Sequence, residues 1–297
     1  AAGLRWLSEV LPEGAVPDFV FEDRRQYLFA MTEVPRPHEN WKEVLMAGRF
    51  AMNELLERVG RAAELLAVIH RRGRPPVRAS AAEESAHQNE DALPEAGSNA
   101  NGSRNEAGSR IPVIFFDRTA VETLRLDPYY RTTAERVPQA ADFLVELADS
   151  TGERRQTVVH GDFSPKNLLA CPDRLVLLDH EVIHVGDPGL DVGFFLTHLL
   201  SKAHHLRERR DDLVGGVHRF WQRYVEELGG QRIEASGEAP SRNTGDSERS
   251  WPHLGERSVS HLAGCLLARA AGKSALEYLD EEARSRQVEA VCTLLPD

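Results

Sequence analysis

Residues 158–181 bring oxygen-bearing side chains next to runs of apolar residues. Asp162 and Asn167 lie in and just after a polar loop, and Asp179 follows a run of leucine and valine. An unpaired charge is costly beside buried strands, so these side chains need either a partner or a chemical use. Convergent carboxylate and amide oxygens suit a hard cation such as Mg²⁺, which binds one or two protein carboxylates, water and substrate phosphates.

The apolar runs on either side of residues 171–173 (Cys-Pro-Asp) predict an antiparallel hairpin. Pairing the runs about Asp173 places Asn167 opposite Asp179 at the open end, and Asp162 lies in the loop that enters this end. A carboxylate held near the metal but free of it can accept a proton from an attacking hydroxyl. The spacing H-x-D-x-x-x-x-N, followed a dozen residues later by an aspartate after a strand, matches these roles in phosphoryl transfer.

Two stretches carry a family resemblance. The sequence HGDFSPKN at 160–167, with LLDHE at 177–181 and GDPGLDVGFF at 186–195, resembles the aminoglycoside phosphotransferase and choline-kinase-like family of small-molecule kinases. The resemblance extends from Leu4 to about Tyr278, outside two polar insertions. It implies an α+β, two-lobed protein-kinase-like fold, with a small β-containing N-terminal lobe and a larger, mostly helical C-terminal lobe.

The same resemblance assigns roles to residues of the loop and hairpin. It makes Asp162 the catalytic base, and Asn167 and Asp179 the ligands of Mg²⁺. Asp191 resembles the family's aspartate at a helix start, which holds the backbone of the catalytic loop, and a carboxylate is also favourable there because of the helix dipole. We expect His160 to pack this loop in place rather than to carry protons.

The segment FAMTEV at 29–34 resembles the hinge between the two lobes. The resemblance implies that backbone groups around Thr32 and Val34 bind adenine, with Met31 behind it. The cofactors implied are therefore ATP and Mg²⁺, and the partner is a small molecule with a hydroxyl group.

For several other polar residues near the motif, the sequence allows two interpretations. Ser164 and Lys166 either approach the transferred phosphate or lie in a solvated loop. Glu181 either reaches the metal or only lines the cleft. Asp187 is expected to cap or brace the turn at Pro188. Near the C-terminus, Arg269 or Lys273 either contributes to the substrate pocket or belongs to a helix that breaks at Gly272.

Kinases of this shape also need a glycine-rich loop and a strand lysine that grips the phosphates. Neither precedes the hinge, and Lys42, which follows it, is the first lysine of the sequence. We therefore expect residues 1–34 to be the remnant of an N-terminal lobe and hinge, and residues 35–297 to be the catalytic lobe. The first part of the N-terminal lobe is expected upstream of Ala1.

Apolar spacing predicts the elements that position these residues. A helix is expected over 4–10, then an antiparallel hairpin of two strands between 18 and 34. A long helix with one buried face is expected over 43–70, and an amphipathic helix over 190–207. The stretch 122–149 should be helical, with breaks at Pro128 and Pro138.

The 297 residues, 41% of them hydrophobic, are enough for a sizeable core. The net charge of -11 disfavours a non-specific nucleic-acid binder. Three widely separated cysteines fit a reducing cytosol, and no apolar run reaches the roughly 18 residues of a membrane span. We therefore expect a cytoplasmic protein without membrane or nucleic-acid partners. Residues 79–110 and 231–250, poor in large apolar residues, are predicted to be disordered insertions.

The function that these features favour is transfer of the γ-phosphoryl group of ATP to a small-molecule hydroxyl. The acceptor could be aminoglycoside-, choline- or sugar-like, because fold alone does not fix substrate. The missing phosphate lysine motivates a second hypothesis, a pseudokinase-like binding module. A Mg²⁺-dependent phosphohydrolase is a third, and it would need no hinge. The oligomeric state is left open.

Overall fold

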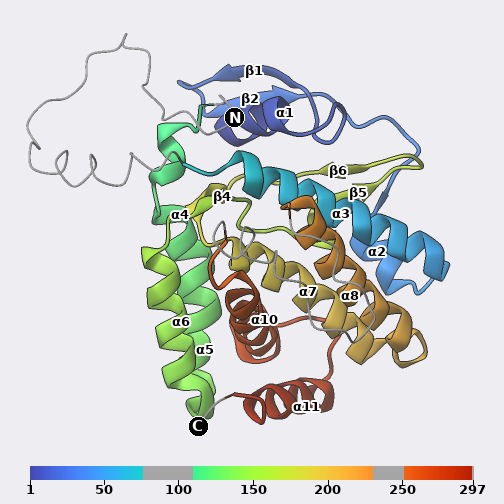
Figure 1. Cartoon of the computed structure of the whole chain (residues 1–297), viewed down its shortest axis with the longest axis vertical. Helices are drawn as coiled ribbons and strands as arrows, with labels where there is room; N and C mark the ends of the chain where they lie inside the picture. The colour runs from blue at the N-terminus through green and yellow to red at the C-terminus, as the bar shows by residue number, and fades with distance from the viewer. Residues whose placement is uncertain (76–109, 230–250, 296–297) are drawn as a thin grey trace, which may run out of the picture.

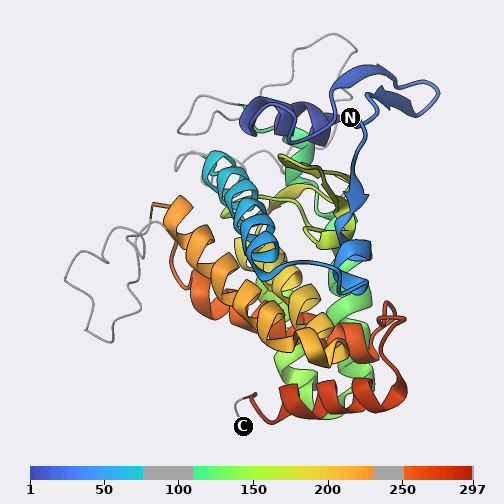
Figure 2. The same cartoon turned by 90° about the vertical axis from the view of Figure 1, so that its right-hand side faces the viewer.

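The computed structural model describes residues 1–75, 110–229 and 251–295. A small N-terminal part with a β-hairpin lies over a larger, mostly helical body, and the two views in Figures 1 and 2 agree on this arrangement. The architecture agrees with the predicted two-lobed α+β fold. Apart from Arg110, both predicted insertions, 79–110 and 231–250, lie outside the described residues.

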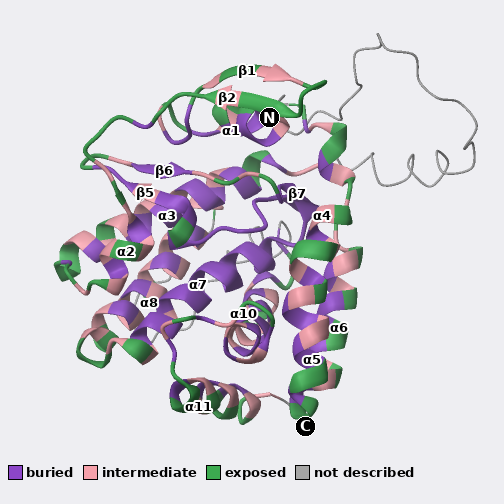
Figure 3. Ribbon diagram, turned by 180° about the vertical axis from the view of Figure 1, so that it is seen from behind, coloured by how far each residue is buried: buried purple, intermediate pink, exposed green. Residues whose placement is uncertain are grey.

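The N-terminal part consists of helix α1 (Ala2–Val10) and the antiparallel strands β1 (Phe19–Asp23) and β2 (Leu28–Met31), as predicted. Helix α1 buries Trp6, whose ring meets Phe115 edge-on at 5.9 Å between centroids. The strands are much less buried, and Figure 3 shows β2 largely exposed. The N-terminal part is therefore attached to the body through α1 rather than through its hairpin.

The predicted hairpin is formed by β5 (Leu168–Ala170) and β6 (Leu175–Leu177), and β3 (Glu39–Asn40) pairs with β5 at its edge. Its register differs from the prediction by one residue, since the Leu178 N–H donates to the Asn167 carbonyl at 2.9 Å. Asn167 therefore lies opposite Leu178, and Asp179 follows one position later. The reason is a two-residue turn, which the hydrogen bond from Cys171 to Arg174 closes.

Strands β4 (Thr157–Val159) and β7 (His184–Gly186) form a second antiparallel pair. In the sequence, β4 precedes the motif loop and hairpin, and β7 follows them. Every residue of both strands is buried. The loop with the H-x-D-x-x-x-x-N motif thus leaves a rigid strand at Val159, which fixes the direction in which Asp162 enters the site.

The predicted helix over 43–70 is two helices, α2 (Trp41–Met46) and α3 (Met52–Arg72). The chain breaks at Gly48, whose φ of +63° is outside the helical region and suits glycine. The Asn40 side chain caps α2 by accepting from the Lys42 N–H at 3.0 Å.

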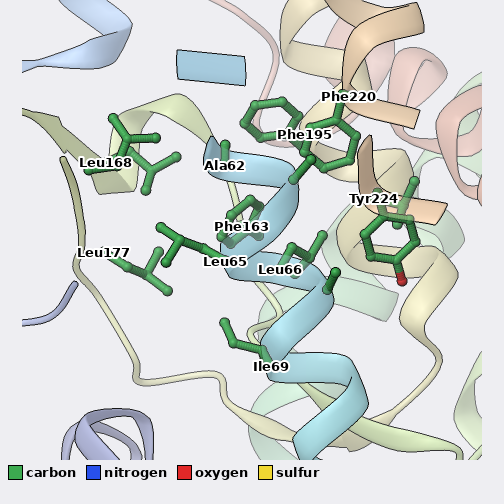
Figure 4. Packing of buried hydrophobic residues seen from close by; sticks show 14 of the residues in the cluster. Ala62, Leu65, Leu66, Ile69, Phe163, Leu168, Leu177, Phe195, Phe220 and Tyr224 are labelled. Carbon is green, nitrogen blue, oxygen red and sulfur yellow. The ribbon is translucent and has the colours of Figure 1, made fainter. Parts of the chain in front are cut away.

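Helix α3 provides one wall of the main core (Figure 4). Its apolar face packs around Phe163 of the motif loop, between the β5–β6 hairpin and the two helices α7 (Pro188–His205) and α8 (Arg210–Glu227). The labelled side chains of this contact are Ala62, Leu65, Leu66, Ile69, Phe163, Leu168, Leu177, Phe195, Phe220 and Tyr224. Because Phe163 directly follows Asp162, burial of its ring holds the loop against α3.

Helix α7 is central, and nearly all of its residues are buried, so the predicted single buried face is wrong. It is covered by α8 and by α10 (Leu254–Ala271), and the approach to α10 is very close. A Cβ at Gly193 would lie 2.5 Å from the backbone nitrogen of Leu262. Glycine at this position therefore lets the two helices touch.

The remaining elements complete the helical body. They are η2 (Val113–Phe116), α4 (Thr119–Val121), η3 (Glu122–Arg131), α5 (Thr132–Arg136), η4 (Pro138–Ala140), α6 (Ala141–Glu153), η5 (Pro165–Asn167), η6 (Arg207–Arg209) and α11 (Glu281–Cys292). The predicted break at Pro128 is wrong, because η3 is a π-helix that accommodates this proline, whereas the chain does change direction at Pro138. Among the described residues, no helix is both long and apolar enough to span a membrane.

Candidate active site

The backbone of the motif loop is anchored by Asp191, a fully buried carboxylate in the first turn of α7. Its two oxygens accept hydrogen bonds from the backbone N–H of His160 at 2.7 Å and of Gly161 at 2.8 Å. Gly161 has a φ of +77°, and a Cβ there would lie 2.7 Å from the Val182 carbonyl oxygen. Only glycine therefore fits this tight turn before Asp162.

Asp191 is itself held by His70 at the end of α3, whose Nε2 lies 3.2 Å from the carboxylate. The Nδ1 of the same ring is 2.6 Å from the hydroxyl of Tyr224 on α8. Burial opposes ionisation of Asp191, but the hydrogen bonds from His70 and from the His160 backbone outweigh it and lower its pKa. Three elements thus fix the start of the motif loop.

His160 connects the loop to the hairpin. Its Nε2 donates to the Leu178 carbonyl at 3.1 Å, and its Nδ1 accepts from the Asp162 N–H at 3.2 Å. The ring is fully buried, and this burial lowers its pKa, so the imidazole is neutral. These contacts place His160 as a brace between Asp162 and the residue before Asp179.

Asp162 lies at the surface of the site with only 6% of its area exposed. Three donor groups contact its Oδ2. They are the Asn167 side-chain amide at 2.9 Å, the Arg125 guanidinium at 3.1 Å and the Lys166 Nζ at 3.4 Å. Since these groups share Oδ2, the other oxygen, Oδ1, is the one that an acceptor hydroxyl would approach. The carboxylate is therefore held in one orientation.

Arg125, in η3, was missed by the sequence analysis. Besides its ion pair with Asp162, its Nε donates to the Gly161 carbonyl at 2.6 Å. It lies far upstream of the motif in the chain, so only the folded chain reveals its position beside Asp162. Its contacts orient both the backbone and the side chain of the motif loop.

Asn167 and Asp179 lie at the mouth of the hairpin. The Asn167 amide nitrogen donates to the Asp162 side chain and to its carbonyl, both at 2.9 Å, which leaves the amide oxygen as the atom for a metal. Asp179 is exposed and has a φ of +62°, a conformation rare outside glycine and often found at functional sites. Glu181 is exposed two residues later.

The donor set at this mouth fits Mg²⁺ bound together with a nucleotide. Within the described residues, no group of three or more His, Cys, Asp or Glu side chains could hold a metal. One amide oxygen and one or two exposed carboxylates are too few to enclose a cation alone. They match the preference of Mg²⁺ for few protein ligands, with phosphates and water completing its coordination.

Asp187 and Ser164 are both buried. Asp187 caps α7 by accepting from the Gly189 N–H at 2.9 Å, and it binds Arg257 at 2.7 Å. Burial opposes its ionisation, but His261 and Arg257 outweigh it and hold the pKa of Asp187 well below its usual range. Asp187 therefore lies in a structural ion-pair cluster, as the turn-bracing interpretation predicts.

The predicted hinge is less open than the sequence suggests. The Thr32 N–H donates to the Asp18 carbonyl at 2.9 Å, so this backbone donor of the predicted hinge is already used within the chain. Val34 is buried against Cys171 and Val176 of the hairpin, and the partly buried Leu169 and Leu178 beside this cluster leave an apolar surface next to the hinge. Met31 is 48% exposed and does not close this surface from behind.

A cavity of about 470 Å³ lies beside Asp162. Ser164 and Lys166 line it from the motif loop, and Arg125 and Tyr129 line it from η3. The remaining residues, which we call the far wall, are His198 of α7, Arg269 of α10, and Lys273 and Ser274, which follow α10. Helix α10 ends at Ala271 with Gly272 as its C-cap, so the predicted helix break is confirmed, and Arg269 and Lys273 also line this cavity.

Comparison with known families agrees with this geometry. Residues 4–224 match the model of a family described as phosphotransferase enzymes. The chain belongs to this phosphotransferase family. Its match thus includes the motif loop, the hairpin, helix α7 and most of helix α8.

Among curated members, methylthioribose kinase of Bacillus cereus (strain B4264) is 27% identical over 134 residues, 43% of this chain and 33% of that protein. Methylthioribose kinase 2 of Oryza sativa subsp. japonica is 30% identical over 93 residues, 30% of this chain and 22% of that protein. The matched part of this phosphotransferase-family chain therefore spans a third or less of these relatives.

Solved structures show the same fold. A choline/ethanolamine kinase family protein from Mesorhizobium loti superposes with a TM-score of 0.50 and 13% identity, covering 100% of this chain and 77% of that one. A glucosamine kinase superposes with a TM-score of 0.52 and 15% identity, covering 99% and 69%. The kinase-like fold predicted for this phosphotransferase-family chain is therefore confirmed.

Proposed function

We propose that this protein transfers the γ-phosphoryl group of ATP to a hydroxyl group of a small molecule, with Mg²⁺. The observation that carries the proposal is the position of Asp162, which lies between a cavity of about 470 Å³ and the hairpin mouth with Asn167 and Asp179. Family membership and the kinase names of the relatives support the same reaction class.

In this reaction the acceptor oxygen bonds to the γ-phosphorus while the bond from that phosphorus to the β–γ bridging oxygen breaks, releasing ADP. Asp162 accepts the hydroxyl proton through Oδ1, since Oδ2 is occupied by its three donors. Mg²⁺ held by Asn167 and Asp179 would supply charge neutralisation for the phosphates. The rest of the rate enhancement comes from positioning, for which the Asp191 anchor of the loop is suited.

The nucleotide base has an apolar seat between hinge and hairpin. Val34, Cys171 and Val176 form a small buried cluster, and the partly buried Leu169 and Leu178 pack against it. An adenine ring lying against the partly buried Leu169 and Leu178 would exchange hydrogen bonds with the Val34 backbone and donate to the Thr32 carbonyl. The base would then place its phosphates near the mouth of the hairpin.

The reaction can be followed by ³¹P NMR with ATP, Mg²⁺ and a panel of hydroxyl compounds. We expect ADP and a phosphomonoester to appear in equal amounts. The test uses the present chain and a chain that extends upstream of Ala1. Inorganic phosphate in place of a phosphomonoester would indicate a phosphohydrolase instead. No nucleotide turnover in either chain would contradict the proposal and favour a binding module.

A further inference from the structure

All lysines of the sequence gather around the cavity beside Asp162. The chain has four, Lys42, Lys166, Lys202 and Lys273, and arginine supplies the rest of its 36 Lys and Arg. Lys166 and Lys273 line the cavity. The Nζ of Lys202 donates to the carbonyl of His198, another lining residue, at 3.2 Å.

Lys42 belongs to the same group, since its Nζ pairs with Glu277, which lies shortly after Lys273 in the chain, at 2.7 Å. Lysine provides a compact ammonium that arginine does not replace. A chain that otherwise uses arginine has therefore placed its lysines at one site.

The cavity has a charge opposite to that of the whole chain. Arg125, Lys166, Arg269 and Lys273 line it, whereas Asp162 is its one lining carboxylate among the described residues. The chain as a whole carries a net charge of -11. A positive cavity in an acidic protein attracts anions and repels amines.

Neighbouring groups do not cancel this charge. Glu277 lies close by, but its carboxylate is paired with Lys42 at 2.7 Å. His198 adds no charge, because burial, followed by Lys202 and Arg269, lowers its pKa well below the usual value.

Two buried donors of this region are poorly paired. Lys202 has no partner of opposite charge, and one nitrogen of Arg269 has no hydrogen-bond partner among the described residues. Lys202 is fully buried, and its contacts are the His198 carbonyl and the ring of Tyr278, 5.6 Å from Nζ. Burial, with help from Lys42 and Arg269, lowers the pKa of Lys202 to about 7. The buried Nε of Arg269 has no hydrogen-bond partner in the part of the chain that is described. Lys202 does not line the cavity, so its ammonium group adds positive charge behind the wall rather than a contact to a ligand.

We propose that the acceptor carries an anionic group, a carboxylate or a phosphate, in addition to the hydroxyl that is phosphorylated. Arg269 and Lys273 would hold this group at the far wall, while the hydroxyl meets Asp162. The inference rests on the proposed phosphoryl transfer and selects among its substrates. It disfavours aminoglycosides, choline and amino sugars, whose positive charges would face Arg269, Lys273 and Lys166.

The test is calorimetric binding, without nucleotide, of two series that differ mainly in charge. One series is glucuronate, glucose and glucosamine, and the other is glycerate, glycerol and 3-amino-1,2-propanediol. We expect the anion of at least one series to bind about tenfold or more tightly than its neutral counterpart, and the amine to bind most weakly. No preference for the anion in either series, or tighter binding of an amine, would overturn the proposal.

Two variants locate the anion site. Lys273→Gln changes an exposed side chain and should remove most of the preference for the anion, and Arg269→Gln should remove it as well. Arg207→Gln is the control, because Arg207 is an exposed cation of η6 that does not line the cavity, and it should keep the preference. Equal loss in the control would show that only the overall charge matters and would overturn the assignment.

The two proposals can fail separately. Adding ATP and Mg²⁺ to the same compounds tests transfer apart from binding. An anion that binds with the expected preference but is never phosphorylated supports the anion site and contradicts the proposed function. Transfer to glucosamine but not to any anion supports the function and contradicts the anion site.

Discussion

Replacing Asp162 with Asn should lower the rate of phosphoryl transfer by about 100- to 10,000-fold. The amide keeps the size of the side chain but cannot accept the hydroxyl proton. Oδ1 is the oxygen left to receive this proton, because Asn167, Arg125 and Lys166 all contact Oδ2. Initial rates of ADP formation with a saturating acceptor measure the effect.

The matched control for this substitution is Asp173→Asn at the opposite end of the same hairpin. The Asp173 side chain is 71% exposed, and its ion pair with Arg174 is a surface contact. We expect Asp173→Asn to leave the rate within about twofold of the unmodified chain, as for a surface change away from special features. Equal rates for both variants would contradict a proton-accepting role for Asp162.

The Asp191→Ala substitution should destabilise the fold by about 3–5 kcal/mol. The backbone N–H groups of His160 and Gly161 would lose their acceptor inside the core, and His70 would lose its buried partner. Urea unfolding followed by circular dichroism gives the free energy of unfolding. We expect the urea concentration at the midpoint of unfolding to be much lower, and the dependence of the free energy of unfolding on urea concentration to be similar.

Asp212→Ala tests whether loss of any helix-start carboxylate has this effect. Asp212 lies in the first turn of α8 and pairs with Arg209 at 2.8 Å at the surface. Its removal should change the free energy of unfolding by less than about 1 kcal/mol. A loss of similar size in the two variants would show that Asp191 is not a special anchor of the motif loop.

The residues of the proposed site could be found from sequence because most of them are close in the chain. Asp162, Asn167 and Asp179 belong to one loop and hairpin, so local strand signals were enough to place them near one another. The register that sets which of these residues lie opposite each other could not be predicted in this way. The register shifted by one residue because the turn at Pro172 and Asp173 closes with two residues, which apolar spacing does not specify.

Long-range features escaped the sequence for a different reason. Arg125 meets Asp162 only because η3 packs beside the motif loop, and the grouping of Lys42, Lys202 and Lys273 depends on how distant helices meet. The full burial of α7 likewise follows from α8 and α10 covering its outer faces. The spacing of apolar residues along a helix predicts one buried face, whereas a central helix is covered on all sides.

In the proposed reaction, the mouth of the β5–β6 hairpin binds the phosphates of ATP together with Mg²⁺. Calorimetric titration of ATP, with and without Mg²⁺, into the present chain, a chain extended upstream of Ala1, and their Asp179→Ala variants tests it most directly. We predict binding that requires Mg²⁺ and that Asp179→Ala weakens at least about tenfold, the loss of one charge-assisted contact. Binding that ignores both the metal and the substitution, or no binding in either chain, would contradict the account.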